Sequence, residues 1–148
     1  MKKFHFSLEK LKDFREQKLQ EQKNFLGKLR HELNEINAEI NTLRSRVKEK
    51  NKELTLLYKK GAVSFEISTH KRYIISLQQE IKARQHAAVL KEKDIEKQTL
   101  VVLEATKDLK TLENLEEKQI EEYKKQETKE NELFIEEFVA NSSFRGEN

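Results

Sequence analysis

Two side chains in this sequence are spaced so that they could hold a metal ion. His31 and Glu35 lie four residues apart, which places both on one face of a helix. A metal site needs three or four ligands, and the H-E-x-x-H spacing of a helical zinc site is absent. We therefore interpret the two residues as a solvated surface pair and predict no metal site.

Other catalytic chemistry has even less support. The paired carboxylates Glu116-Glu117, Glu121-Glu122 and Glu136-Glu137 are sequence neighbours, so on a helix the members of each pair point apart and form a charged face. There is no cysteine for a thiol nucleophile or a disulfide, and three isolated glycines cannot build a phosphate-binding loop. We predict no catalytic residue and no cofactor, and a protein that is not an enzyme.

The composition favours long helices around a thin core. The chain has 148 residues, no proline and three glycines, so the residues that break helices are nearly missing. Charged residues make up 39% and apolar residues 35%, which is typical of coiled coils. The mean hydropathy of −0.92 also allows disorder, so the periodicity of the apolar residues has to decide between the two.

The charge balance argues against a nucleic-acid binder. Thirty Lys and Arg face 27 Asp and Glu, and the basic residues do not cluster with aromatic ones. Residues 1–60 carry 16 basic and 9 acidic side chains, whereas residues 116–138 carry 4 Lys and 9 Glu, so the two regions would partly neutralise each other in an antiparallel hairpin. The absence of cysteine, signal peptide and membrane-spanning run predicts a soluble cytoplasmic protein.

Apolar residues recur alternately three and four positions apart, which is the 3.5-residue period of a left-handed coiled coil. In the first half of the chain this seam is interrupted only by Lys50. Its members are Leu26, Leu29, Leu33, Ile36, Ile40, Leu43, Val47, Leu54 and Leu57.

The second half repeats the pattern in a weaker form, because four seam positions are polar: His70, Arg84, Lys91 and Gln98. Each forgoes the roughly 1.5–3 kcal/mol that burial of a large aliphatic side chain provides. The apolar members are Ile67, Ile74, Leu77, Ile81, Ala88, Ile95, Val102, Ala105, Leu109 and Leu112.

Gly61 separates the two periodic halves. Glycine accepts the left-handed conformation that ends a helix, and Lys59 and Lys60 complement the helix dipole there. We predict an all-α fold, a single two-helix antiparallel coiled-coil hairpin over residues 1–148. Its helices cover about 5–60 and about 67–140, with a turn at about 61–66 and a frayed tail at 141–148. The alternative is one continuous helix through Gly61.

Two groups of apolar residues are candidates for contacts with a partner. Tyr58, Tyr73 and Leu77 lie on either side of the turn, where they would be partly exposed and would either cover the end of the hairpin or form a docking patch. The second helix is longer than the first, so its last ~20 residues should extend beyond the N-terminus. Aromatic residues near the two termini would then need a partner protein or a second copy.

Three motifs resemble those of the bacterial flagellar export family FliJ. The chain opens with Phe4-x-Phe6-x-Leu8-x-x-Leu11-x-x-x-Arg15-Glu16. After the turn it has Tyr73-x-x-x-Leu77-x-x-x-Ile81, and it continues with Leu112-Glu113-x-Leu115-x-x-Lys118-x-x-x-Glu122-Tyr123 and then Glu136-Glu137-Phe138. Their order and spacing cover nearly the whole chain.

The resemblance implies a coiled coil similar to the gamma-subunit stalk of rotary ATPases. Such a protein is expected to insert its terminal half into the ring of the export ATPase FliI, to promote ring assembly, to contact the export gate protein FlhA and to cycle export chaperones. It would be peripheral at the cytoplasmic face of the inner membrane and reach the membrane only through the gate. The gate contact would use Tyr73, Leu77 and Ile81. The ATPase contact would use Phe4, Phe6, Leu8, Leu11, Tyr123, Phe134 and Phe138.

A generic coiled-coil scaffold without a link to an ATPase is the alternative. In that case the C-terminal overhang would give weak self-association, with Phe134 and Phe138 meeting their symmetry mates.

Overall fold

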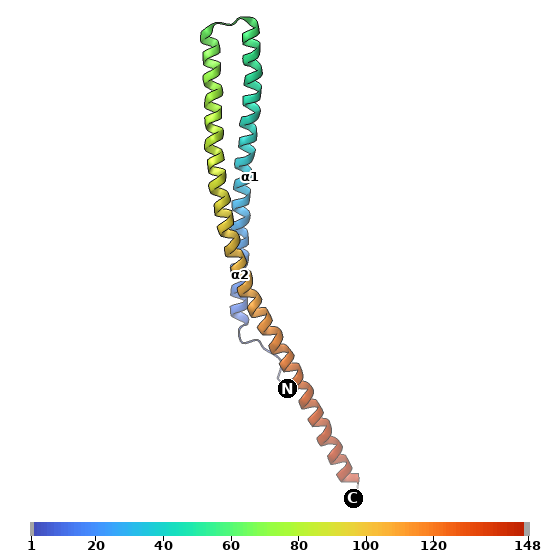
Figure 1. Ribbon diagram of the computed structural model, residues 1–148. Helices are drawn as coiled ribbons and strands as arrows, with labels where there is room; N and C mark the ends of the chain where they lie inside the picture. Colours follow the sequence, from blue (N-terminus) through green and yellow to red (C-terminus); the bar gives the residue numbers. More distant parts are fainter. Residues whose placement is uncertain (1, 147–148) are drawn as a thin grey trace. The chain divides into compact units, whose positions relative to one another are not determined.

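The computed structural model describes residues 2–146, with side chains as far as residue 143. It contains two helices, α1 (Glu9–Lys60) and α2 (Ser64–Gly146), and no strand within the described residues (Figure 1). The predicted all-α helical hairpin is confirmed. Contacts divide the chain into a turn unit, Glu21–Val102, and a terminal unit formed by Met1–Gln20 with Leu103–Asn148.

The hairpin turn follows from the conformation of one glycine. Gly61 has a φ of 70°, in the left-handed region. Its N–H donates to the carbonyl of Tyr58 at 3.2 Å, and the N–H of Ala62 donates to the carbonyl of Leu57 at 3.1 Å. This pair of bonds is a Schellman motif, which satisfies the last carbonyls of α1 and ends the helix. A continuous helix through Gly61 is excluded.

The helix ends differ from the expected ones. The carbonyl of Val63 accepts the first bond of α2, from the N–H of Ile67, so α2 begins at Ser64 rather than near residue 67 and the turn is shorter than 61–66. The first helix begins at Glu9, not near residue 5. The second helix continues through 141–146, where a frayed tail was expected, because nothing between Ser64 and Arg145 breaks a helix. Residues 147–148 lie outside the described part.

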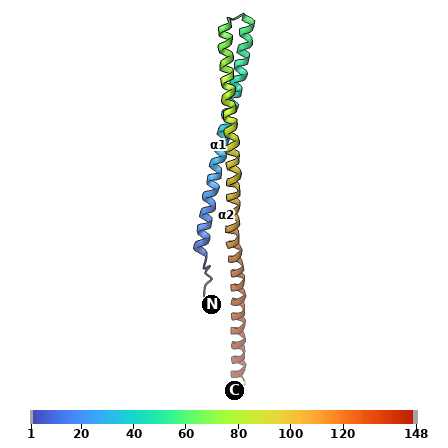
Figure 2. The same ribbon diagram turned by 60° about the vertical axis from the view of Figure 1, so that its left-hand side comes forward.

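In the turn unit, the predicted seam forms the core. The two helices lie side by side and run antiparallel from the turn (Figures 1 and 2). Every predicted seam position in this unit is buried or half-buried. The buried apolar side chains are Leu26, Leu29, Ile40, Leu43, Ile74, Leu77 and Ala88. The 3.5-residue spacing of the sequence is therefore the spacing of the helix interface.

The polar seam positions bond across the interface instead of only weakening it. Lys91 Nζ lies 2.7 Å from Glu32 Oε2, and Arg84 Nη1 lies 3.2 Å from Glu39 Oε2. The hydrogen bond from Lys91 lowers the pKa of Glu32, and the same bond raises the pKa of Lys91. Each pair joins α2 to α1, so the polar positions fix which residues of the two helices stand opposite each other.

The terminal unit has a smaller core. Its buried apolar side chains are Phe6, Leu19 and Leu112. Lys12 Nζ donates to Glu116 Oε2 at 2.7 Å, and this bond raises the pKa of Lys12. No helix within residues 2–146 is long and apolar enough to span a membrane.

Candidate partner-binding surfaces

A shallow groove of about 560 Å³ lies beside the turn. Side chains of both helices line it, and we call it the turn groove. Phe65 on its wall is 79% exposed, and Tyr73 is 43% exposed. The full lining is Lys50, Leu57, Phe65, Glu66, Thr69, His70 and Tyr73. Its apolar wall and exposed aromatic rings suit a partner side chain better than a reaction.

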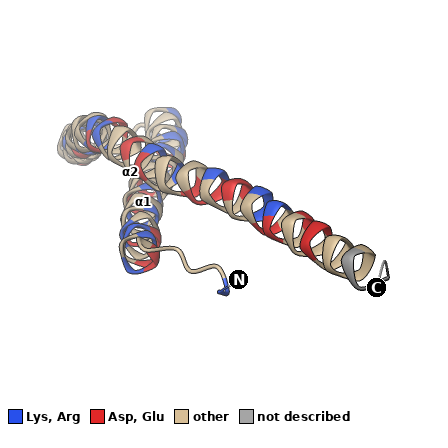
Figure 3. Cartoon of the chain, turned by 90° about the horizontal axis from the view of Figure 1, so that it is seen from below, with Lys and Arg blue, Asp and Glu red and all other residues tan. Residues whose placement is uncertain are grey.

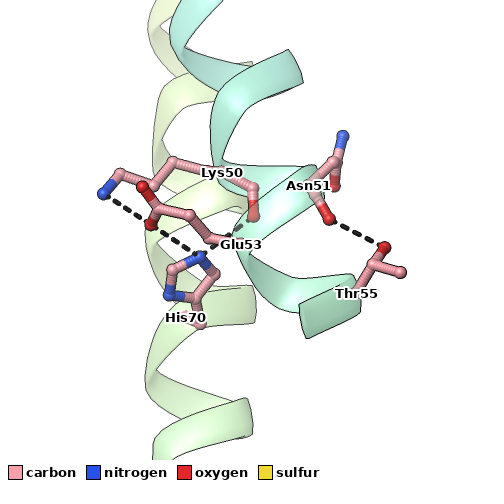
Figure 4. A network of polar contacts seen from close by, with 5 residues as sticks. All are labelled: Lys50, Asn51, Glu53, Thr55 and His70. Atoms are coloured by element: carbon pink, nitrogen blue, oxygen red, sulfur yellow. Dashed lines mark hydrogen bonds and ion pairs between the residues drawn. The ribbon is translucent and has the colours of Figure 1, made fainter. Parts of the chain in front are cut away.

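A polar network fixes one side of the turn groove (Figure 4). His70 Nε2 on α2 lies 3.0 Å from the carbonyl oxygen of Lys50 on α1 and 3.6 Å from Glu53 Oε2. Lys50 Nζ donates to Glu53 Oε2 at 3.0 Å, and this hydrogen bond raises the pKa of Lys50. The same ammonium group lies 5.6 Å from the centre of the Tyr73 ring. Three charged or polar side chains therefore position the aromatic ring that faces solvent.

The three residues predicted for the gate contact have different surroundings. Tyr73 lines the turn groove. Leu77 is only 3% exposed and belongs to the seam, so the expectation that it would be partly exposed is wrong. Its place follows from the seam spacing, which sets it three residues after Ile74. Ile81 is half-buried in the same seam. Of the three, Tyr73 alone is exposed to a partner without movement of the helices.

The residues predicted for the ATPase contact divide into a packed and an exposed group. The rings of Phe4 and Tyr123 have centroids 5.6 Å apart, and the Tyr123 hydroxyl donates to the carbonyl of Lys2 at 2.5 Å. Phe6 is buried and Leu8 half-buried. The contacts of Tyr123 with Phe4 and Lys2 hold the segment that precedes α1 against α2. Leu11, Phe134 and Phe138 are exposed.

The exposed group belongs to the C-terminal stretch of α2. Every residue from 124 to 143 is exposed, including Phe134 at 69% and Phe138 at 65%. At 100° per residue, Phe134, Ile135, Phe138 and Val139 fall within an arc of about 140° on one helix face. We call these four residues the C-terminal apolar face. The basic residues of this stretch lie near its start, and every charged residue from 130 to 143 is acidic (Figure 3).

Ile135 and Val139 share this face but were not among the predicted site residues. Their spacing of four, beside the equal spacing of Phe134 and Phe138, was a signal for an unpartnered amphipathic face. His31 and Glu35 form the surface pair that the sequence predicted. His31 Nε2 lies 2.9 Å from Glu35 Oε1, and both side chains are more than half exposed.

Comparison with known proteins agrees with the motifs. The family model described as "Flagellar FliJ protein" matches residues 4–148. No curated protein and no solved structure matches the chain significantly. Since the match spans essentially the whole chain and the hairpin fold agrees with it, the chain belongs to the flagellar FliJ protein family and is a component of the flagellar protein export apparatus.

Proposed function

We propose that this chain is a stalk-like coiled coil that binds the export ATPase FliI and promotes assembly of its ring. It also binds the export gate protein FlhA and export chaperones, and so couples ATPase and gate at the cytoplasmic face of the inner membrane. The observation that carries the proposal is the C-terminal apolar face, which no residue of this chain covers within the described part. An apolar helix face of this kind calls for a protein partner.

The terminal unit is the proposed ATPase-binding part. Two packed helices of 10–12 Å each are about 20 Å across, which suits the pore of a ring-shaped partner. Phe4, Phe6 and Tyr123 anchor the segment that precedes α1, and the C-terminal apolar face contacts the partner directly. The packed residues therefore support the proposed site, and Phe134 and Phe138 contact the ATPase.

The turn groove is the proposed gate-binding part. Tyr73 supplies an exposed ring that Lys50 holds in place, and Leu57 supplies apolar wall. Leu77 and Ile81 maintain the helix interface beneath it. A partner side chain that enters the groove would meet apolar and aromatic surface.

Stimulation of the cognate export ATPase tests the first half of the proposal. The ring contact between Phe4 and Tyr123 allows a more specific deletion than removal of residues 120–148. A chain ending at Tyr123 keeps this contact but lacks the C-terminal apolar face. It should no longer raise ATP turnover, and neither should Phe134→Ser with Phe138→Ser. Leu100→Ser, an equally exposed change on α2, should keep the stimulation. Full stimulation by the double variant would refute the assignment.

Self-association is the second candidate function, and the same face favours it. Phe134 and Phe138 of two copies could bury each other in a symmetric dimer. Sedimentation of the purified chain at micromolar concentration separates the candidates. A monomer supports the stalk, whereas a dimer that Phe134→Ser dissociates supports the scaffold.

A further inference from the structure

The outermost residues of the turn form an exposed apolar surface that extends beyond the turn groove and shares Phe65 with it. Val63 is 66% exposed and Phe65 is 79% exposed, the highest value among the large apolar side chains of residues 2–143. Leu56 and Tyr58 are also more than half exposed. In Figures 1 and 2 the turn joins α1 and α2 at one end of the turn unit, and these four residues belong to the turn or to the adjoining ends of the two helices.

Cations surround this apolar end on both helices. Between residues 56 and 73 there are four basic side chains and one acidic side chain, Glu66. The basic residues are Lys59, Lys60, Lys71 and Arg72, and all four are exposed. Within the described residues, Lys59, Lys60 and Arg72 form no ion pair, while the ammonium of Lys71 lies 5.5 Å from the centre of the Tyr58 ring. The turn is thus both apolar and positively charged.

We propose that the hairpin turn binds directly to an anionic lipid surface, with Val63 and Phe65 entering the interface and the four cations contacting lipid phosphates. Exposed aromatic and aliphatic groups partition into the boundary of a bilayer, and nearby Lys and Arg are attracted to anionic headgroups. The proposal goes beyond gate binding, because it assigns the turn a lipid contact of its own.

Charge and shape together favour lipid over a protein partner here. A protein site that holds a protruding side chain is concave, as the turn groove is, whereas Val63 is 66% exposed and does not line that groove. The C-terminal apolar face provides an internal contrast, since it lies in a segment with 9 Glu and 4 Lys over residues 116–138. An anionic surface would repel that segment and attract the turn.

Vesicle cosedimentation of the full chain tests the proposal. The chain should bind vesicles that contain both phosphatidylcholine and phosphatidylglycerol. It should not bind vesicles that contain only phosphatidylcholine. Lys59→Gln with Lys60→Gln should lower the partition coefficient by about five-fold for each cation removed, and added salt should weaken binding by the wild type. Val63→Ser with Phe65→Ser should lower it by at least about ten-fold.

Leu90→Ser with Leu100→Ser is the matched control, because these exposed residues of α2 lie away from the turn. It should bind the mixed vesicles like the wild type. Circular dichroism should show unchanged helicity for every variant. Tyr73→Ala should also keep vesicle binding, which separates this surface from the proposed gate site.

A spectroscopic readout reports insertion independently of affinity. The chain has no tryptophan, so Phe65→Trp introduces a single reporter. Its emission should shift to shorter wavelength on the mixed vesicles and stay unchanged with phosphatidylcholine alone. The proposal is overturned if the mixed vesicles do not bind, if Val63→Ser with Phe65→Ser binds them as well as the wild type, or if that variant loses only binding to the export gate's cytoplasmic domain.

Discussion

Gln98 on α2 donates hydrogen bonds from its side-chain amide to two oxygens of Gln22 on α1, the side-chain carbonyl at 2.7 Å and the backbone carbonyl at 3.0 Å. Gln98 is the buried polar residue of the seam within the described side chains. A polar residue at such a position fixes the register of two helices at some cost in stability. The bond therefore sets which part of α1 faces which part of α2.

Replacing Gln98 tests this role. Gln98→Ala should lower the free energy of unfolding by about 1–2 kcal/mol, because it removes both hydrogen bonds and leaves a gap. Gln98→Leu should be neutral or stabilising by up to about 1 kcal/mol, since a large aliphatic side chain fills a seam position. Urea denaturation followed by circular dichroism measures both. A Gln98→Leu variant as unstable as Gln98→Ala would show that the hydrogen bonds are not offset by apolar packing.

Two glycines give a matched pair of substitutions. Gly61→Ala should destabilise the hairpin by about 1 kcal/mol, because its φ of 70° is strained for alanine even though the added Cβ meets no atom within 4 Å. Gly27→Ala has the same open surroundings in the middle of α1 and should stabilise it by about 0.5–1 kcal/mol. Thermal unfolding of the two variants should therefore shift in opposite directions. Equal shifts would contradict the left-handed turn.

The pair formed by Glu32 and Lys91 makes stability depend on pH. The pKa of Glu32 is lowered from 4.5. The stability that its carboxylate contributes is therefore complete above pH 4.5 and is lost as the pH falls through the lowered pKa. The pKa of Lys91 is raised from 10.5, so its contribution is complete below pH 10.5 and is lost as the pH rises through the raised value.

Glu32→Gln should consequently be less stable than the wild type at neutral pH. The difference between their urea midpoints should shrink as the pH falls below 4.5, where the wild type also loses the carboxylate. Glu35→Gln serves as the control. Within the described residues Glu35 pairs only with His31, on the same exposed helix face, and this pair contributes little to stability. A constant difference between wild type and Glu32→Gln from neutral to acid pH would contradict the role of the ion pair.

Leu77 and Tyr73 separate stability from binding at the turn unit. Leu77→Ala removes a buried seam side chain and should lower the free energy of unfolding by about 2–4 kcal/mol. Tyr73→Ala changes an exposed ring and should alter it by less than about 1 kcal/mol while weakening binding to the export gate. Calorimetry and a gate pull-down measure the two effects. If both variants bind the gate normally while Leu77→Ala remains folded, the turn groove is not the gate site.

The sequence predicted the seam because its spacing leaves little choice. Residues three and four apart share a helix face, so Leu26, Leu29 and Leu43 had to face a neighbour, and Gly61 marked where the chain could reverse. The spacing does not say which residue stands opposite. The partners of Gln98 and Lys91 depend on the register of two distant segments, which periodicity leaves open.

The candidate site was harder to predict than the fold. The motif resemblance selected both Leu77 and Tyr73 as site residues. In the structure Leu77 is buried in the seam, whereas Tyr73 lies outside the seam and is exposed. Ring contacts such as that between Phe4 and Tyr123 join residues far apart in sequence, and no local pattern indicates them. The exposure of Phe134 and Phe138 was easier to predict, because the second predicted helix is longer than the first and its end has no partner within the chain.

The uncovered stretch of α2 beyond Tyr123 has an energetic consequence. A helix without a neighbour is held only by its own backbone hydrogen bonds, and such helices are marginal in water. Its amide protons should therefore exchange with deuterium far faster than those of the seam residues. Capture of this stretch by a partner would order it at the moment of binding, so part of the interaction energy is spent on folding, which lowers affinity and lets the complex come apart readily.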